Sequence, residues 1–246
     1  MTGQRSPACR TAGRLLPLLL SLLFPLLLIP DRSHRSSAQV AAGTVDVAIV
    51  LAVDCSWSVD ETEYAQQIGG LADAFASSDV HQAIAAGANG RIAVALMQWA
   101  APDAQKLVIG WTIVEAPEDA LLLSARIAAT PRIVGDGATS ITAAITTGAA
   151  LHGARPSRAL RQVIDISSDG INNTGGLPEP ARDLAAARGI TINGLTILNE
   201  VPYLHHYFRN HIIAGPGAFV EVAEDYADYH RAIRRKLLRE IGLPVS

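Results

Sequence analysis

The chain has 246 residues, with 20 Lys and Arg against 23 Asp and Glu, so its formal net charge is −3. Residues 39–246 alone contain 15 basic and 22 acidic residues, so their net charge is −7. This acidic balance argues against nucleic acid or an anionic membrane surface as a partner, and the remaining length suffices for one sizeable core.

The first segment, 1–38, predicts a secretory signal peptide. Three arginines precede an apolar run at 15–30, which is too short and too interrupted by proline to favour a membrane span. Ser36 and Ala38 supply the small residues of a cleavage site, so we predict cleavage after Ala38, with an uncleaved anchor as the alternative. The mature chain is then expected in the periplasm or outside the cell, without stable membrane insertion.

Beyond a short tail at 39–45, apolar runs typical of strands buried on both faces alternate with segments of helical spacing. The link between the second and third runs is too short for a crossover helix, so these two runs predict a hairpin with one antiparallel edge strand. The six runs are 45–53, 91–100, 105–114, 162–168, 190–198 and 218–223.

Apolar residues at steps of three and four predict the helices. One such series runs from Tyr64 to Phe75 and another from Tyr226 to Leu237. The alternation predicts a single α/β domain at 46–241, followed by a short tail at 242–246. We expect a doubly wound, mostly parallel six-stranded sheet with one antiparallel edge strand and helices on both faces. Further helices are predicted at 117–128, 140–151, 179–188 and 202–211.

Five polar side chains follow predicted strands or precede a predicted helix. In a doubly wound sheet, ligands bind beyond the carboxyl ends of the strands, where the winding reverses. Carboxylates and hydroxyls are hard oxygen donors that suit Mg²⁺ or Mn²⁺, and five of them would leave a position open for an anion from outside. The five candidate metal ligands are Asp54, Ser56, Ser58, Thr139 and Asp169.

These residues give the chain a resemblance to the von Willebrand factor A (vWA) superfamily. Its metal-ion-dependent adhesion site (MIDAS) has the pattern Asp-x-Ser-x-Ser, a distant Thr and a distant Asp, and DCSWS, GATSITAAI and ISSDGINN match these in order. The C-terminal part looks most like a secreted bacterial group of unknown function. The resemblance implies central, neighbouring strands ending at Asp54 and Asp169, and a protein partner that donates an acidic side chain to the metal.

Several of these residues have alternative interpretations. Ser58 with Glu61 also matches a capping box at a helix start, while Thr139 could be an ordinary loop residue and Asp169 part of a turn. Trp57, between the two serines, is either a candidate partner contact or a side chain that folds back onto the domain.

Three other features have simpler explanations than a functional site. Only Cys55 follows the predicted signal, so we expect no intrachain disulfide in the mature chain and a buried, unreactive thiol. The histidines at 205, 206 and 211 do not share one helical face, which favours a packing or surface role over a transition-metal site. The basic run at 231–239 predicts a solvated helix face.

Two rival functions accompany the binding module. One is Mg²⁺-dependent phosphoryl transfer with Asp54 as nucleophile, and the other is a metal-free vWA scaffold. The enzyme requires a lysine near the nucleophile, but the chain has only Lys106 and Lys236, neither at the end of a predicted central strand. We therefore predict a secreted or periplasmic, divalent-cation-dependent protein-binding module that is not an enzyme.

Overall fold

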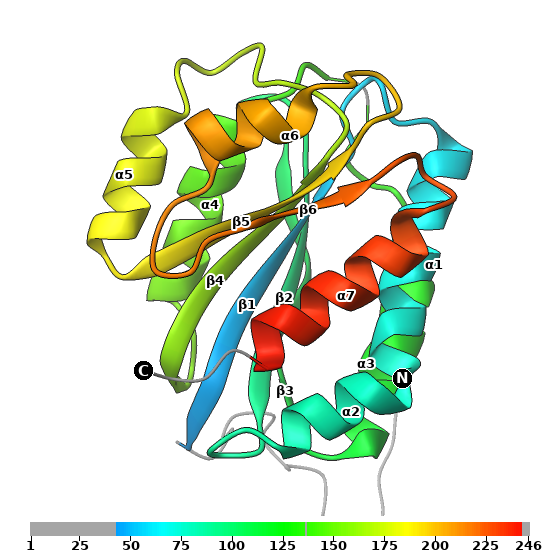
Figure 1. The fold of residues 1–246 in the computed structure, drawn as a ribbon, viewed down its shortest axis with the longest axis vertical. Helices are drawn as coiled ribbons and strands as arrows, with labels where there is room; N and C mark the ends of the chain where they lie inside the picture. The colour runs from blue at the N-terminus through cyan, green and yellow to red at the C-terminus, as the bar shows by residue number, and fades with distance from the viewer. Residues whose placement is uncertain (1–42, 136, 243–246) are drawn as a thin grey trace, which may run out of the picture. The chain divides into compact units, whose positions relative to one another are not determined.

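A computed structural model describes residues 43–135 and 137–242. Six strands form one sheet in the order β3-β2-β1-β4-β5-β6 (Figure 1). Only β3 runs antiparallel to its neighbour, at one edge, and the other pairs are parallel, so the predicted fold class is confirmed. The strands are β1 (Thr44–Asp54), β2 (Ile92–Trp99), β3 (Gln105–Val114), β4 (Arg158–Ser168), β5 (Ile190–Ile197) and β6 (Val220–Ala223).

Helices cover both faces of the sheet (Figure 1). One apolar cluster packs α1, α2, α3 and α7 against one face, and a second packs α4, α5, α6 and a π-helical turn, η1, against the other. The helices are α1 (Glu61–Ala76), α2 (Ser78–Ala85), α3 (Pro117–Ala128), α4 (Ile141–Gly153), α5 (Glu179–Ala187), α6 (Leu204–Tyr207) and α7 (Tyr229–Gly242), with η1 at Phe208–Ile212. No helix in the described ranges is long and apolar enough to span a membrane.

The centre of the sheet explains the continuous apolar runs. Strand β1 lies between β2 and β4, and each of its residues from Val45 to Asp54 is buried. Covering on both faces leaves no place for the alternation of polar residues seen in half-exposed strands. The expectation that the strands ending near Asp54 and Asp169 are central neighbours is confirmed by the β1–β4 pairing.

Some strands begin at other residues than predicted, because strand pairing extends beyond the apolar run of the sequence. Strand β4 begins at Arg158, four residues earlier than predicted, because Arg158 pairs with Thr44 at the start of β1. That same pairing places Thr44 within the sheet, so β1 begins two residues before the domain start predicted at 46. The eight-residue helix α2 was not predicted, and the predicted signal at 1–38 lies outside the described residues.

A buried polar contact line joins β4 to α7. Nζ of Lys236 lies 2.6 Å from Oδ1 of Asp165 and 2.7 Å from Oε1 of Glu240. Two residues further along β4, Oγ of Ser167 lies 3.2 Å from the hydroxyl of Tyr229. Polar groups thus fix the position of α7 against the middle of the sheet.

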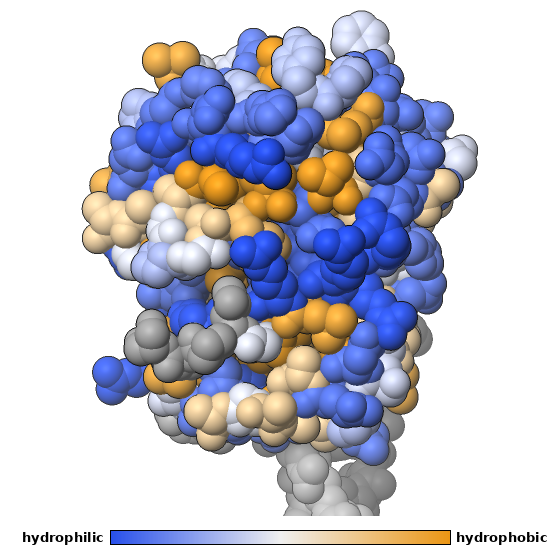
Figure 2. All heavy atoms as spheres, viewed as in Figure 1, coloured by the Kyte–Doolittle hydropathy of each residue, from blue (hydrophilic) through white to orange (hydrophobic). Residues whose placement is uncertain are grey.

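The prediction of a fully solvated basic face on the last helix is wrong for Lys236. Its side chain is fully buried, because it points to the sheet where Asp165 and Glu240 supply the opposite charge. The outward face of α7 is hydrophilic in Figure 2. The exposed arginines of this helix are Arg231, Arg234, Arg235 and Arg239.

Candidate metal centre

The predicted ligands come together at the carboxyl ends of β1 and β4. Asp54 is the last residue of β1 and Asp169 follows β4, and both are fully buried. Oγ of Ser58 donates a 2.7 Å hydrogen bond to Oδ1 of Asp169, and Oγ of Ser56 lies 3.4 Å from Oγ of Ser58. Residues 111 positions apart in the chain therefore share one cluster of oxygen atoms.

The chain turns tightly after Asp54, and this turn orients its carboxylate. Oδ1 accepts a 2.7 Å hydrogen bond from the backbone N–H of Ser56, while Oδ2 accepts one of 2.5 Å from Oγ of Ser168. The side chain of Gln67 in α1 donates to the backbone oxygen of Asp54 at 3.2 Å. The first strand, the first helix and β4 thus all hold this residue in place.

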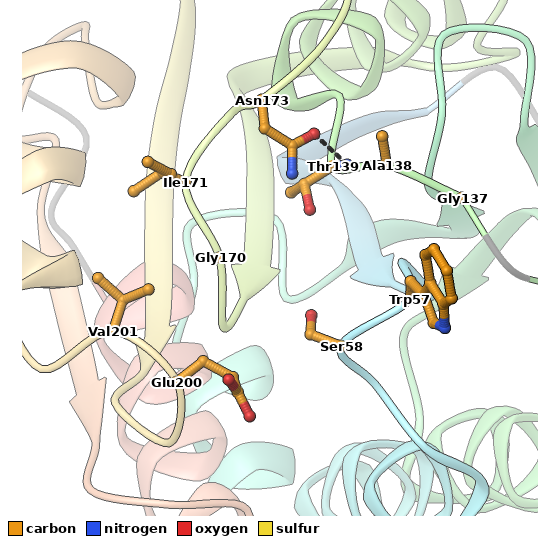
Figure 3. A pocket seen from close by; sticks show the side chains of 10 residues that line it. All are labelled: Trp57, Ser58, Gly137, Ala138, Thr139, Gly170, Ile171, Asn173, Glu200 and Val201. Carbon is orange, nitrogen blue, oxygen red and sulfur yellow. Dashed lines mark hydrogen bonds between the residues drawn. The ribbon is translucent and has the colours of Figure 1, made fainter.

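Thr139 lies in the loop before α4, and its side chain faces Ser58. Its backbone N–H donates to Oδ1 of Asn173, and its carbonyl accepts from the N–H of Asn173, both at 2.9 Å. The side chain is 5% exposed, yet its hydroxyl has no hydrogen-bond partner among the described residues. Figure 3 shows the hydroxyls of Thr139 and Ser58 pointing toward one another.

A cavity of about 670 Å³ opens above these residues. The indole of Trp57 is 82% exposed at its rim, so the interpretation in which this side chain folds back onto the domain is wrong. The backbone N–H of Trp57 donates to the carbonyl of Gly137 at 2.9 Å, which holds the tryptophan in place. The lining residues are Trp57, Ser58, Gly137, Ala138, Thr139, Gly170, Ile171, Asn173, Glu200 and Val201 (Figure 3).

The alternative role of Ser58 as a helix cap is also wrong. Helix α1 is capped by Asp60, whose Oδ1 accepts from the N–H of Glu63, while Oε2 of Glu63 accepts from the N–H of Asp60, both at 2.8 Å. The capping box therefore starts two residues later than predicted. The hydroxyl of Ser58 is engaged by Asp169 instead.

No positive charge of the described chain offsets the two buried carboxylates, which leaves a deficit of positive charge at this site. Burial, together with the charge of Asp169, raises the pKa of Asp54 to about 7. Burial raises the pKa of Asp169 as well, and the charge of Glu200 adds to that effect. Neither aspartate forms an ion pair with a basic residue of the described chain. A cation would offset this deficit, and the oxygen donor set fits a hard divalent ion.

Three supporting residues were not predicted. The hydroxyl of Tyr226 donates to Oδ2 of Asp169 at 2.9 Å, and Ser168 donates to Asp54 as described. Nη2 of Arg132 donates to the backbone oxygen of Cys55 at 3.1 Å. The sequence shows Ser168 as a hydroxyl next to Asp169. No residue near Tyr226 or Arg132 in the sequence indicates that their side chains contact the candidate metal centre.

Cys55 is fully buried beneath the turn, which agrees with the predicted packing role. Burial, followed by the charge of Asp54, raises the pKa of its thiol to about 12. The thiol therefore stays protonated at neutral pH, and a protonated, enclosed thiol is a poor nucleophile.

The histidine cluster has contacts of its own. Nδ1 of His211 lies 2.6 Å from Oε1 of Glu179, and the rings of His205 and His206 are tilted by 40° with centroids 4.1 Å apart. Within residues 43–135 and 137–242, no group of three or more His, Cys, Asp and Glu side chains is arranged to hold a metal. The candidate centre at Asp54 depends on hydroxyls as well as carboxylates.

A family model described as "Protein of unknown function (DUF1194)" matches residues 44–245. No curated protein matches the chain.

Solved structures share the fold at low identity. Proximal thread matrix protein 1 from the mussel byssus, solved with a zinc-occupied MIDAS motif, is 16% identical with a TM-score of 0.55, over 81% of this chain and 48% of that one. A von Willebrand factor type A protein from Catenulispora acidiphila is 14% identical with a TM-score of 0.58, over 80% and 43%. This chain thus spans about half the length of these two proteins.

The third comparison is with a single domain. The vWF domain of the type V pili tip protein Mfa5 from Porphyromonas gingivalis is 12% identical with a TM-score of 0.55, and the match covers 83% of this chain and 98% of that domain. At such identities the likeness concerns the fold.

Proposed function

The chain belongs to the DUF1194 family of proteins of unknown function, and because its fold is that of a vWA domain we propose that it is a protein-binding module that depends on a divalent cation. Its partner is a protein that donates an acidic side chain to the cation. The vWA structures that it resembles include a byssus matrix protein and a pilus tip protein, which is consistent with adhesion.

One observation carries the proposal: two buried carboxylates without a basic partner among the described residues lie next to the cavity floor, where Ser58 donates to Asp169 and also lines the cavity. Asp54, Ser56, Ser58, Thr139 and Asp169 would hold Mg²⁺ or Mn²⁺, directly or through water. When bound, the cation would offset the two negative charges and attract a carboxylate from outside. The chain's own residues orient the aspartates through hydrogen bonds from Ser58, Ser168 and Tyr226.

The distribution of lysines does not support the phosphoryl-transfer alternative. Lys106 is exposed on the edge strand β3, and Lys236 is buried against Asp165 in the interior of β4. Neither can hold a phosphoryl group at Asp54 without a large rearrangement. The remaining alternative is a vWA scaffold that binds no metal. Thermal unfolding with and without divalent cations distinguishes it from the proposed function.

We also propose that the module works outside the cytoplasm. The support is the arrangement of charge, apolar run and small residues at 1–38. N-terminal sequencing of the protein from its native host checks this, since an N-terminus at Gln39 is expected.

Thermal unfolding of the purified protein with EDTA, Mg²⁺, Mn²⁺, Ca²⁺ or Zn²⁺ tests the metal. A cation at 100 times its dissociation constant should stabilise the wild type by about 2.7 kcal/mol. Asp54→Asn should lose this gain but match or exceed the wild type in EDTA, because it removes a buried charge. Asp183→Asn, at an exposed carboxylate of α5, is the control. A wild type that no cation stabilises would favour the metal-free scaffold.

A further inference from the structure

The cavity above the candidate metal centre has a polar floor and two unlike walls (Figure 3). The floor includes Ser58 and Thr139, whose hydroxyls point toward one another. The indole of Trp57 stands on one side, while Glu200 and Val201 lie on the other. A ligand that reaches the floor must therefore pass between an aromatic ring and a carboxylate.

Glu200 is the one wall residue with a charge. It lies just beyond β5, its side chain is exposed, and in the described part of the chain it forms neither an ion pair nor a side-chain hydrogen bond. Nearby Glu63 differs, because its Oε1 accepts from Asn199 at 3.1 Å and its Oε2 caps α1. Glu200 is thus available to a ligand, whereas Glu63 is already engaged.

The charge of Glu200 affects which ligand side chains can lie beside a ligand carboxylate that is bound at the cation. A divalent cation would offset Asp54 and Asp169, so Glu200 would remain as the negative charge in the cavity lining. A ligand carboxylate at the cation would bring a further negative charge close to it. A second acidic group in the ligand would then be repelled by Glu200, and a basic group would be attracted.

We propose that the cavity binds a protein segment that presents an acidic side chain to the metal, a basic side chain to Glu200 and an apolar side chain to Trp57. This inference rests on the proposed metal-dependent binding and specifies its partner. Trp57 contributes exposed apolar area at the rim, where aromatic residues most often supply binding energy. Glu200 contributes selectivity more than affinity, because exposed charge pairs are weak.

An array of immobilised nine-residue peptides tests the charge preference. Each peptide has a central Glu and one flanking Leu, with Lys, Ser or Glu varied at the other positions, and labelled protein is applied with Mg²⁺ or EDTA. With Mg²⁺, Lys-containing peptides should be retained up to about fivefold more than their Glu counterparts. Added salt should reduce this ratio.

Variants assign the preference to Glu200. Glu200→Gln should bring the ratio of Lys to Glu peptides below about twofold, and Glu200→Lys should reverse it. Glu118→Gln, at an exposed carboxylate of α3, should leave the ratio unchanged. Trp57→Ala should lower retention of all Leu-containing peptides without altering the ratio.

The outcomes separate this inference from the proposed function. If retention requires Mg²⁺ but the Lys preference is absent or persists in Glu200→Gln, the inference is overturned and metal-dependent binding stands. If Asp54→Asn retains the same peptides as the wild type, metal-dependent binding itself is wrong. An array that retains no peptide also counts against the inference, and the thermal shift with Mg²⁺ then decides the metal centre separately.

Discussion

The hydroxyl of Tyr226 donates a 2.9 Å hydrogen bond to Oδ2 of Asp169. Because Ser58 donates to Oδ1 of the same carboxylate, both oxygens of Asp169 are held by groups from distant parts of the chain. Tyr226 lies three residues before α7, which is itself fixed to β4 by Lys236 and Tyr229. The C-terminal segment therefore contributes directly to the candidate metal centre.

Replacing Tyr226 by Phe removes this hydrogen bond and keeps the ring. Partners that orient a metal ligand typically contribute 10- to 100-fold to affinity, so Mg²⁺ affinity measured by calorimetry should fall at least about tenfold. Tyr203→Phe is the matched control, since Tyr203 is 62% exposed. Equal Mg²⁺ affinities in both variants would show that the hydrogen bond from Tyr226 to Asp169 does not contribute to metal binding.

Thr139→Val replaces a hydroxyl that has no partner among the described residues by a methyl group of the same shape. The free energy of unfolding in EDTA should therefore stay within about 0.5 kcal/mol of the wild type or increase. Mg²⁺ affinity should fall, because an oxygen donor is lost. Thr146→Val removes an exposed hydroxyl that donates to the carbonyl of Thr142, and it should leave Mg²⁺ affinity unchanged. A Thr139→Val variant with wild-type affinity would exclude this residue from the ligand set.

Lys236→Met should destabilise the protein strongly. It leaves Asp165 and Glu240 buried without their cation, a change that typically costs about 3–5 kcal/mol. Arg235→Met, next in the chain, removes a side chain that is 62% exposed and 3.3 Å from Glu221, and should cost less than about 1 kcal/mol. Urea unfolding measures both. Similar losses in the two variants would argue against the buried contact line between β4 and α7.

His152 should make the fold sensitive to acid. Its Nε2 donates to the carbonyl of Val163 at 2.9 Å, and burial, with the charge of Arg155, lowers the pKa of the imidazole to about 4. A pKa depressed on folding gives stability that is present above the unfolded value of about 6.5 and lost as the pH falls toward 4.

The loss attributable to His152 is about 3 kcal/mol over that window. His152→Gln keeps a donor but cannot be protonated, so the difference in unfolding free energy between it and the wild type should shrink with falling pH. His206→Gln, at an exposed ring, is the control substitution. Parallel curves for wild type and His152→Gln would contradict the assignment.

The fold was predictable because its strongest signals are local. The run at 45–53 is apolar at every position but Asp46, a pattern typical of a strand covered on both faces. The five candidate ligands were predictable for a related reason: each follows or precedes a recognisable element, and the topology then brings those ends together.

What was missed depends on distant partners. Tyr226 has the spacing of a helical residue, yet the chain turns at that point and its hydroxyl meets Asp169, 57 positions away. Lys236 stands among arginines and differs from them only because Asp165 lies opposite it in β4. Ser58 satisfies a local capping pattern, but Asp169 competes for its hydroxyl and Asp60 caps the helix instead.

Because the thiol of Cys55 is buried, a cysteine introduced on the exposed rim of the cavity can be labelled selectively. Of the two cysteines in the chain, Cys55 alone lies in the described residues, and it is fully enclosed. A cysteine introduced at Trp57, whose side chain is 82% exposed, would react with a maleimide dye far faster than Cys55. A single fluorophore at that position would report directly on cations and peptides that enter the neighbouring cavity.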